Sequence, residues 1–396
     1  MFFCDFSYTH IIKRKINISS FLYFIGGFMK ENNLRLIVMD NIQEFGQKVD
    51  EHLKLMQGIT DENFSFIVPV RMTRFASGEA KAEILESIRA KDVFVLTDVM
   101  NYSCTYKMYG FINHKSPDDH FQDLKRVISA MDGGAETVRV IMPFLYESRQ
   151  HKRKGRESMD SSMALHELEH MDVNSIITFD AHDPNIRNAL QHCSFDNLYP
   201  TYSILKDFIE NEEIDFNKLL VVSPDTGAVD RAIYYADMLG TDVGIYHKRR
   251  DYSQVVDGKN PIVAHEYMGA DVNGKHVIIV DDMIASGQSM LDVAEQLKTR
   301  GAKNIYLIAS FALFSDGEKS IDAFKKAHKN KIFTKCYSSN LSYVPDEIKN
   351  QDWFHLADCS KYISKLIHTL SNHESISPLL NSKEKIINKI SEVKDR

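Results

Sequence analysis

Cysteine is scarce in this sequence, and its five copies form no pattern that could hold a zinc ion or a disulfide framework. They are odd in number, widely scattered and include no Cys-x-x-Cys pair (Cys4, Cys104, Cys193, Cys336 and Cys359). This usage argues against a disulfide-dense secreted scaffold and against a cysteine-based metal module. We therefore expect the reducing environment of the cytoplasm.

Long apolar runs and an excess of positive charge are also missing. No stretch approaches the ~20 apolar residues that a membrane-spanning helix needs. Lysine and arginine total 48 against 55 aspartates and glutamates, so the formal net charge is -7. Such a balance offers no global surface for nucleic acid or for an anionic membrane, and any binding of phosphate must be local.

No linker rich in proline, glycine or serine divides the 396 residues, so domain boundaries must come from the pattern of elements. At roughly 150 residues per domain, two or three domains are expected. We place one domain at 29–199 and a second at 200–370, with the boundary near Tyr199 and Pro200. The tail at 371–396 is polar and lysine-rich, and we expect it to lie at the surface or to be disordered.

The first 28 residues differ in pattern from the rest of the chain. A basic cluster at 13–15 precedes an apolar stretch at 21–29, but the small-residue cleavage site of a signal peptide is missing. Residues 25–27 can be encoded by a bacterial ribosome-binding sequence just ahead of the Met29 codon. We therefore expect translation to begin at Met29 and residues 1–28 to be a non-native leader.

From about Phe64 onward, short apolar runs alternate with amphipathic segments of helical length. This alternation predicts an α/β fold, and the continuously apolar runs are typical of strands buried in a parallel sheet. The segment at 101–116 lacks periodicity and is interpreted as an inserted loop. The expected strands are 66–70, 92–97, 137–142, 175–180, 219–223, 243–246, 276–280 and 304–309. The expected helices are 80–89, 119–131, 159–171, 228–239, 290–300 and 361–370.

The most informative segment runs from Val277 to Ser289, where an apolar strand leads into two aspartates and a turn of small residues before a helix. N–H groups and hydroxyls at a helix N-terminus suit a phosphomonoester, and carboxylates at a strand end suit vicinal sugar hydroxyls. An acidic turn with a serine cap is the plainer alternative. We favour a sugar site at Asp281 and Asp282 and a phosphate site after them (Ala285, Ser286, Gly287, Gln288 and Ser289).

This segment resembles the ribose 5-phosphate loop shared by phosphoribosyltransferases and ribose-phosphate pyrophosphokinases. Further segments resemble the pyrophosphokinase family in the expected order, over roughly residues 35 to 365. They are Arg74 to Glu79, Pro143 to Arg153, Asp180 to His182, Ser223 to Gly227, and Lys248 to Arg250. The resemblance implies two phosphoribosyltransferase-like domains, each a mostly parallel β-sheet flanked by helices, assembled as a homo-oligomer of dimers or hexamers.

The resemblance also implies an activity, in which pyrophosphate passes from ATP to the C1 hydroxyl of ribose 5-phosphate, giving 5-phosphoribosyl 1-pyrophosphate and AMP. It assigns Lys248 and Arg250 to the transferring group, and His182 and Asp225 to Mg²⁺. Positioning and electrostatics dominate such chemistry. The ATP-binding residues it implies are Phe75, Ser77, Gly78, Glu79, Arg149 and Gln150.

Three positions depart from the family pattern, because Ser77, His151 and Ala285 stand where the family usually has aspartate. These changes leave open an altered nucleotide preference, a weaker enzyme or a non-catalytic regulatory paralogue. A phosphoribosyltransferase is a further alternative, but it would not explain Arg149, Lys248 or Arg250.

A competing motif, His166-Glu167-x-x-His170, fits the zinc site of metalloproteases. Because the chain has 16 histidines, the motif can also occur by chance. The same segment carries an apolar stripe at Met163, Leu168 and Met171, as a packing helix would. We therefore favour an ordinary helix over a zinc site here.

Overall fold

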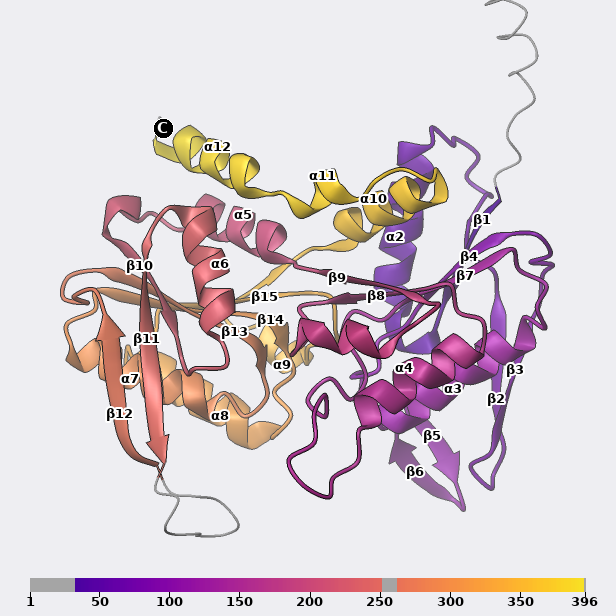
Figure 1. Ribbon diagram of the computed structural model, residues 1–396, viewed down its shortest axis with the longest axis horizontal. Coiled ribbons are helices and arrows are strands. Elements are labelled where there is room, and N and C mark those ends of the chain that lie inside the picture. The colour runs from indigo at the N-terminus through magenta and orange to yellow at the C-terminus, as the bar shows by residue number, and fades with distance from the viewer. Residues whose placement is uncertain (1–32, 251–261, 395–396) are drawn as a thin grey trace, which may run out of the picture.

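The computed structural model describes residues 33–250 and 262–394, which form two α/β halves lying side by side (Figure 1). The first half is built on a five-stranded sheet and the second on a seven-stranded sheet. None of the helices in these two ranges is long and apolar enough to cross a membrane. The expected leader at 1–28 falls outside the described residues.

The sheet of the first half has the order β1-β4-β7-β8-β9, with every neighbouring pair parallel. The expected strand at 66–70 is reduced to one bridge, Ile67 with Leu36, on the free edge of β1. The other expected strands of this half are confirmed. The strands are β1 (Leu34–Val38), β4 (Asp92–Leu96), β7 (Thr137–Ile141), β8 (Ser175–Phe179) and β9 (Ser194–Leu198), and the helices are α2 (Gln43–Met56), α3 (Pro117–Ala130) and α4 (Asp160–His170).

Two hairpins stand out from this half (Figure 1): β2 (Val70–Arg74) with β3 (Ala80–Ile84), and β5 (Thr105–Met108) with β6 (Phe111–His114). The expected helix at 80–89 is therefore wrong. Its first five residues alternate apolar and charged side chains, a period of two, and they pair with β2 in antiparallel register. The segment at 101–116, interpreted as a loop, contains the second hairpin.

The sheet of the second half has the order β12-β11-β10-β13-β14-β15-β16, parallel except for the pair β11 and β12. Its central strands β10 and β14 are buried along nearly their whole length. The expected strands are confirmed, and three of them are longer than expected. The strands are β10 (Leu219–Ser223), β11 (Asp242–Arg250), β12 (Ile262–Gly269), β13 (His276–Ile284), β14 (Asn304–Ala312), β15 (Lys335–Ser339) and β16 (Phe354–Ala357).

Helices cover both faces of this sheet. Those expected at 228–239 and 290–300 are confirmed, and Gly301, with a φ of +89°, ends the second of them. Short 3₁₀ helices are η1 (Asp40–Ile42) and η2 (Pro184–Ala189) in the first half and η3 (Phe216–Lys218) in the second. The helices are α5 (Thr201–Asn211), α6 (Val229–Leu239), α7 (Gln288–Thr299), α8 (Glu318–Lys329) and α9 (Asp346–Lys349).

The C-terminal segment runs along one side of both halves (Figure 1). Helix α10 (Ser360–Ser371) packs on α2, and its apolar side chains belong to the core of the first half. After α11 (Ser377–Leu380), helix α12 (Lys383–Lys394) packs on α5 and α6. The tail at 371–394 therefore lies at the surface, as one of the two expectations held, and the alternative of disorder is wrong because the segment forms packed helices. The boundary near Tyr199 stays a prediction; it falls between β9 and α5, elements of different halves.

Candidate active site

The two halves meet where strand β8 ends and strand β13 carries its two aspartates. His182 follows β8 by three residues, and its Nδ1 lies 2.7 Å from Oδ2 of Asp282. The side chain of Asp282 is 7% exposed and that of His182 is 41% exposed. The structure thus brings together residues that the sequence placed in two separate motifs.

Strand β13 continues through both aspartates to Ile284, so they lie within the strand and do not follow it as expected. The reason is register, because Asp281 pairs with Ala309 and Ile284 with Ala312 on the neighbouring β14. Successive side chains of a strand point to opposite sides. Asp282 accordingly faces His182, while Asp281 Oδ1 lies 3.7 Å from Nη1 of Arg231.

The carboxyl groups of Asp281 and Asp282 differ in acidity. Burial and the adjacent charge of Asp282 raise the pKa of Asp281 well above its usual range. Burial also raises the pKa of Asp282, but the hydrogen bond from His182 and the charge of Arg231 outweigh it, and the pKa lies below its usual range. The same hydrogen bond to Asp282 raises the pKa of His182. A hydroxyl-rich or cationic ligand at Asp281 would relieve the repulsion between the two carboxylates.

The predicted phosphate loop connects β13 to α7, which begins at Gln288. Gly287 caps this helix with a φ of +71°, and a Cβ at that position would lie 2.2 Å from Cε2 of Phe324. Glycine is therefore required here by both conformation and space. The N-terminus of α7 presents backbone N–H groups and the positive end of the helix dipole, which suits an anion.

The predicted metal residues do not form a closed cage. Asp225 lies in the turn after β10, where its Oδ1 accepts hydrogen bonds from the N–H groups of Gly227 (2.8 Å) and Ala228 (3.2 Å). His182 pairs with Asp282 and not with Asp225. Across 33–250 and 262–394, no group of three or more His, Cys, Asp or Glu side chains could hold a metal ion. Mg²⁺ bound to phosphates needs only one or two protein carboxylates, and Asp225 is of that kind.

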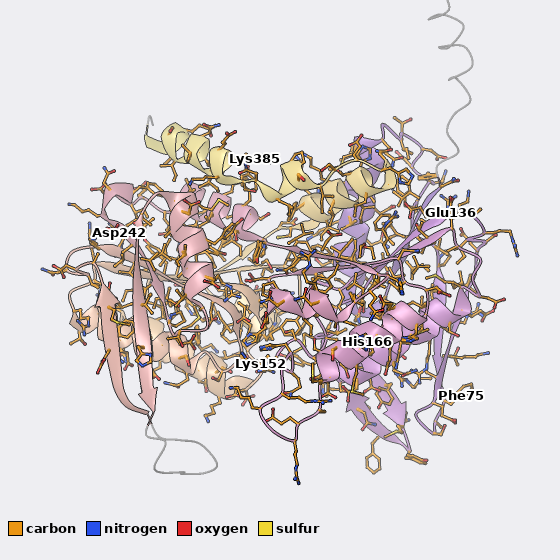
Figure 2. All side chains as sticks on the ribbon, viewed as in Figure 1. Phe75, Glu136, Lys152, His166, Asp242 and Lys385 are labelled. Carbon is orange, nitrogen blue, oxygen red and sulfur yellow. The ribbon has the colours of Figure 1, made fainter. Side chains whose placement is uncertain are left out.

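The loop after β7 brings the predicted Arg149 and Gln150 to the same place. The ring of His151 lies 5.4 Å from that of His182, and the charge of Arg149 lowers the pKa of His182 against the larger effect of Asp282. The side-chain amide of Gln150 donates to the Ser158 carbonyl oxygen at 2.8 Å. Figure 2 shows Lys152 of this loop near the boundary between the halves.

The other predicted ATP residues lie elsewhere. The loop between β2 and β3 exposes Phe75 by 46%, and the hydroxyl of Ser77 donates to Glu79 at 2.9 Å. Gly78 has a φ of +94°. Figure 2 shows Phe75 at the outer edge of the first half, well away from Lys152. Within one chain, these residues are not brought to the His182–Asp282 contact.

Lys248 and Arg250 occupy the end of β11, where the backbone pairs with His265 and Ile262 of β12. Their side chains lie outside the described part of the structure, so their assignment to the transferring group stays a prediction.

Two buried residues at the site had no role of their own assigned from the sequence: Asp180, which belongs to the segment at 180–182, and Arg231. The Arg231 guanidinium binds the Asp180 carboxylate, and the two residues are 51 positions apart. Burial works against the charge of Arg231, but Asp180 raises the pKa of Arg231 above its usual range. An arginine in the first turn of a helix, four residues after Gly227, was the available signal. Nothing in the sequence identified its partner.

The His166-Glu167-x-x-His170 motif lies on α4, which packs as favoured above through Leu168, but the expected stripe is wrong at Met163, which is 53% exposed. His166 Nε2 hydrogen-bonds with the Ala189 carbonyl oxygen at 2.8 Å, and His170 Nδ1 with the carbonyl oxygen of His166 at 2.6 Å. Glu167 forms an ion pair with Lys125 at 2.7 Å. One ring nitrogen of each histidine and the Glu167 carboxylate are thus engaged in the fold.

Comparison with known proteins gives the same division into halves. Residues 34–171 match the N-terminal domain of ribose phosphate pyrophosphokinase, and residues 203–340 match the phosphoribosyl transferase domain. The ribose-phosphate pyrophosphokinase of Vibrio parahaemolyticus is 28% identical over 332 residues, covering 83% of this chain and 96% of that protein. That of Mycoplasmopsis pulmonis is 27% identical over 328 residues, covering 82% and 92%.

The fold has a solved counterpart. The crystal structure of phosphoribosylpyrophosphate synthetase from Mycobacterium smegmatis superposes with a TM-score of 0.69 at 21% identity, covering 86% of this chain and 99% of that one. Both halves, their order and their extent therefore agree with one family. The chain belongs to the ribose-phosphate pyrophosphokinase family.

Proposed function

We propose that the protein transfers pyrophosphate from ATP to the C1 hydroxyl of ribose 5-phosphate, giving 5-phosphoribosyl 1-pyrophosphate and AMP. The observation that carries this proposal is the 2.7 Å contact between His182 and Asp282. It supports the proposal because the β13–α7 segment, to which we assign the sugar and the phosphate, lies against the end of β8 and the loop that carries Arg149. A sugar phosphate and a triphosphate could meet at such a junction.

Ribose 5-phosphate would bind to the second half. The carboxylates of Asp281 and Asp282 accept hydrogen bonds from the vicinal hydroxyls, and the start of α7 around Ser286 to Ser289 receives the 5-phosphate. This arrangement fixes the sugar at two ends. The C1 hydroxyl is then directed toward the junction between the halves.

In the transfer, the C1 oxygen forms a bond to the β-phosphorus of ATP, the bond from that phosphorus to the α,β-bridging oxygen breaks, and the hydroxyl proton is released. The charge on the moving group is stabilised by cations and not by acid–base catalysis. Arg149 lies at the junction, and Lys248 and Arg250 are two positions apart on β11. Mg²⁺, held by the phosphates with Asp225 and His182 nearby, would neutralise the triphosphate when bound.

The adenine-side loop requires a second copy of the chain. Phe75, Ser77, Gly78 and Glu79 lie apart from the junction, so we infer that a neighbouring protomer supplies them and that the protein is a homo-oligomer. The inserted hairpin supports this loop, because the N–H of Tyr109 donates to the carbonyl oxygen of Ala76 at 2.9 Å.

The decisive experiment incubates the protein with ATP and Mg²⁺, with and without ribose 5-phosphate, and measures AMP. We expect AMP only when the sugar phosphate is present. Lys248→Ala is the control variant, because it should lose turnover while it still binds ribose 5-phosphate. Binding of ATP without AMP formation would favour a regulatory paralogue. Consumption of 5-phosphoribosyl 1-pyrophosphate with a nucleobase would favour a phosphoribosyltransferase.

A further inference from the structure

Arg231 is a buried guanidinium that contacts both halves of the molecule. From the first turn of α6, its Nε lies 3.0 and 2.9 Å from the two carboxylate oxygens of Asp180, and its Nη2 lies 2.8 Å from Oδ1. The remaining nitrogen, Nη1, lies 3.7 Å from Oδ1 of Asp281, and the side chain is 12% exposed. All three nitrogens therefore face carboxylates, one at the end of β8 and one in β13.

Asp180 is a rigid anchor for this guanidinium. Its φ is +43°, a conformation that residues with a side chain rarely adopt and that the surroundings must hold in place. Its N–H donates to the Leu198 carbonyl oxygen at 2.8 Å, and the Ser310 hydroxyl donates to its carboxylate at 2.5 Å. Ser310 lies on β14 of the second half, so Asp180 is held from both sides of the junction.

The end of β8 thus reaches β13 at two points. His182 contacts Asp282 directly, at 2.7 Å, and Asp180 reaches Asp281 through Arg231. Of the two aspartates that would bind the ribose hydroxyls, Asp282 is oriented by His182 of the first half. Asp281 is oriented by Arg231, which lies on α6 of the second half and is held by Asp180 of the first half. Their positions therefore depend on the junction and not on β13 alone.

We propose that Arg231 is a positioning residue for ribose 5-phosphate, which orients the Asp281 carboxylate by linking it to Asp180. The inference rests on the proposed function and extends it. Arginine suits this role because its planar fork grips Asp180 with two nitrogens and leaves the third for Asp281. A lysine ammonium offers one nitrogen and would satisfy one carboxylate at a time.

The test compares Arg231→Lys and Arg231→Ala with the unmodified protein. Because the loss of one contact with a charged group costs roughly tenfold or more in affinity, we expect the KM for ribose 5-phosphate to rise at least about tenfold. The KM for ATP should change by less than about threefold, since Arg231 orients a sugar ligand. Millimolar guanidinium should restore part of the loss in Arg231→Ala and none in Arg231→Lys.

Arg71→Met is the matched control, because Arg71 forms an exposed ion pair with Glu83 at 3.1 Å with its side chain 61% exposed. Equal rises in both KM values, or no change in either, would overturn the positioning role. Calorimetric binding of ribose 5-phosphate is measured in parallel. If the unmodified protein binds the sugar phosphate but forms no AMP, the proposed function is wrong. In that case, a loss of ribose 5-phosphate binding in Arg231→Lys would still support the positioning role of Arg231. If Arg231→Ala does not fold, as judged by thermal unfolding, Arg231→Lys alone decides the matter.

Discussion

Gly287 shows how a single residue shapes the phosphate loop. Its φ of +71° lies in the left-handed region, and a Cβ there would meet Cε2 of Phe324 at 2.2 Å, inside the core of the second half. Gly274 has almost the same φ, +72°, but a Cβ there would meet nothing within 4 Å. Comparing alanine substitutions at these two glycines therefore separates the cost of an unfavourable φ from the cost of a steric clash.

Gly287→Ala should lower the free energy of unfolding by roughly 1–3 kcal/mol, through overpacking added to an unfavourable φ. It should also weaken ribose 5-phosphate binding, because the start of α7 must shift. Urea denaturation and calorimetry measure the two effects. Gly274→Ala is the control and should cost about 1 kcal/mol without any change in binding. Equal behaviour of the two variants would contradict the steric argument.

At the residue scale, the sequence supports an assignment only where the pattern is local. Asp281, Asp282 and Gly287 were assigned to a sugar and phosphate site because a strand, two carboxylates and a turn follow one another directly, and these assignments stay predictions. Asp180 and Arg231 could not be paired, because their contact depends on how two sheets pack. The effect of Ser77, His151 and Ala285 on nucleotide preference stays a prediction.

At the scale of elements, helix α12 packs on α5 and α6 through one apolar face. Ile386 is fully buried against the core formed with α5 and α6, while its neighbour Ile387 is 47% exposed. Lys389 forms an ion pair with Glu210 of α5 at 2.6 Å. The polar composition of 371–396 suggested a loose tail, but a helix needs only a narrow apolar stripe to dock.

Ile386→Ala should lower the free energy of unfolding by about 2–4 kcal/mol, because it removes buried methylene groups and leaves a cavity. Ile387→Ala is the matched control on the next residue and should change stability by less than about 0.5 kcal/mol. Chemical denaturation of the two variants tests this directly. Similar values for both would mean that α12 does not pack as described.

The segment at 80–89, expected to be a helix, shows how helix-favouring residues can form a strand when a partner strand is available. Alanine, lysine and glutamate favour helices, and that composition outweighed the two-residue alternation in Ala80, Ala82 and Ile84. Pairing with β2 decided the conformation. Strands β4, β8 and β10 could be predicted from the sequence, since their runs are mostly apolar and indicate a buried strand without knowledge of the neighbouring strand.

At the scale of the whole molecule, a second buried carboxylate joins the halves. Asp98 follows β4 and is 1% exposed, and it accepts hydrogen bonds from the hydroxyl of Ser342 and, at 2.7 Å, from the N–H of Tyr343. Both partners follow β15 of the second half. Burial, opposed by these hydrogen bonds, raises the pKa of Asp98 to about 6.

This shift makes a prediction about pH. Folded protein binds a proton at Asp98 more tightly than unfolded protein, whose aspartate titrates near 3.8, so stability falls as pH rises from about 4 to 6. The fall from this group is at most about 3 kcal/mol. The stability of Asp98→Asn relative to unmodified protein should therefore increase across that window and level off above it.

Urea denaturation at several pH values measures this difference, with Asp346→Asn, 84% exposed at its side chain, as the control for the loss of one carboxylate. A constant difference between Asp98→Asn and unmodified protein from pH 4 to 7 would contradict the assignment.

The sequence by itself determined the alternation of strands and helices and the family, because each depends on neighbouring residues in one stretch of chain. Only the tertiary structure decided which motifs meet. It joined His182 to Asp282 and Asp180 to Arg231, left the Phe75 loop apart, and laid α10 and α12 across both halves. Such contacts are set by the packing of whole sheets and helices, which no local pattern specifies.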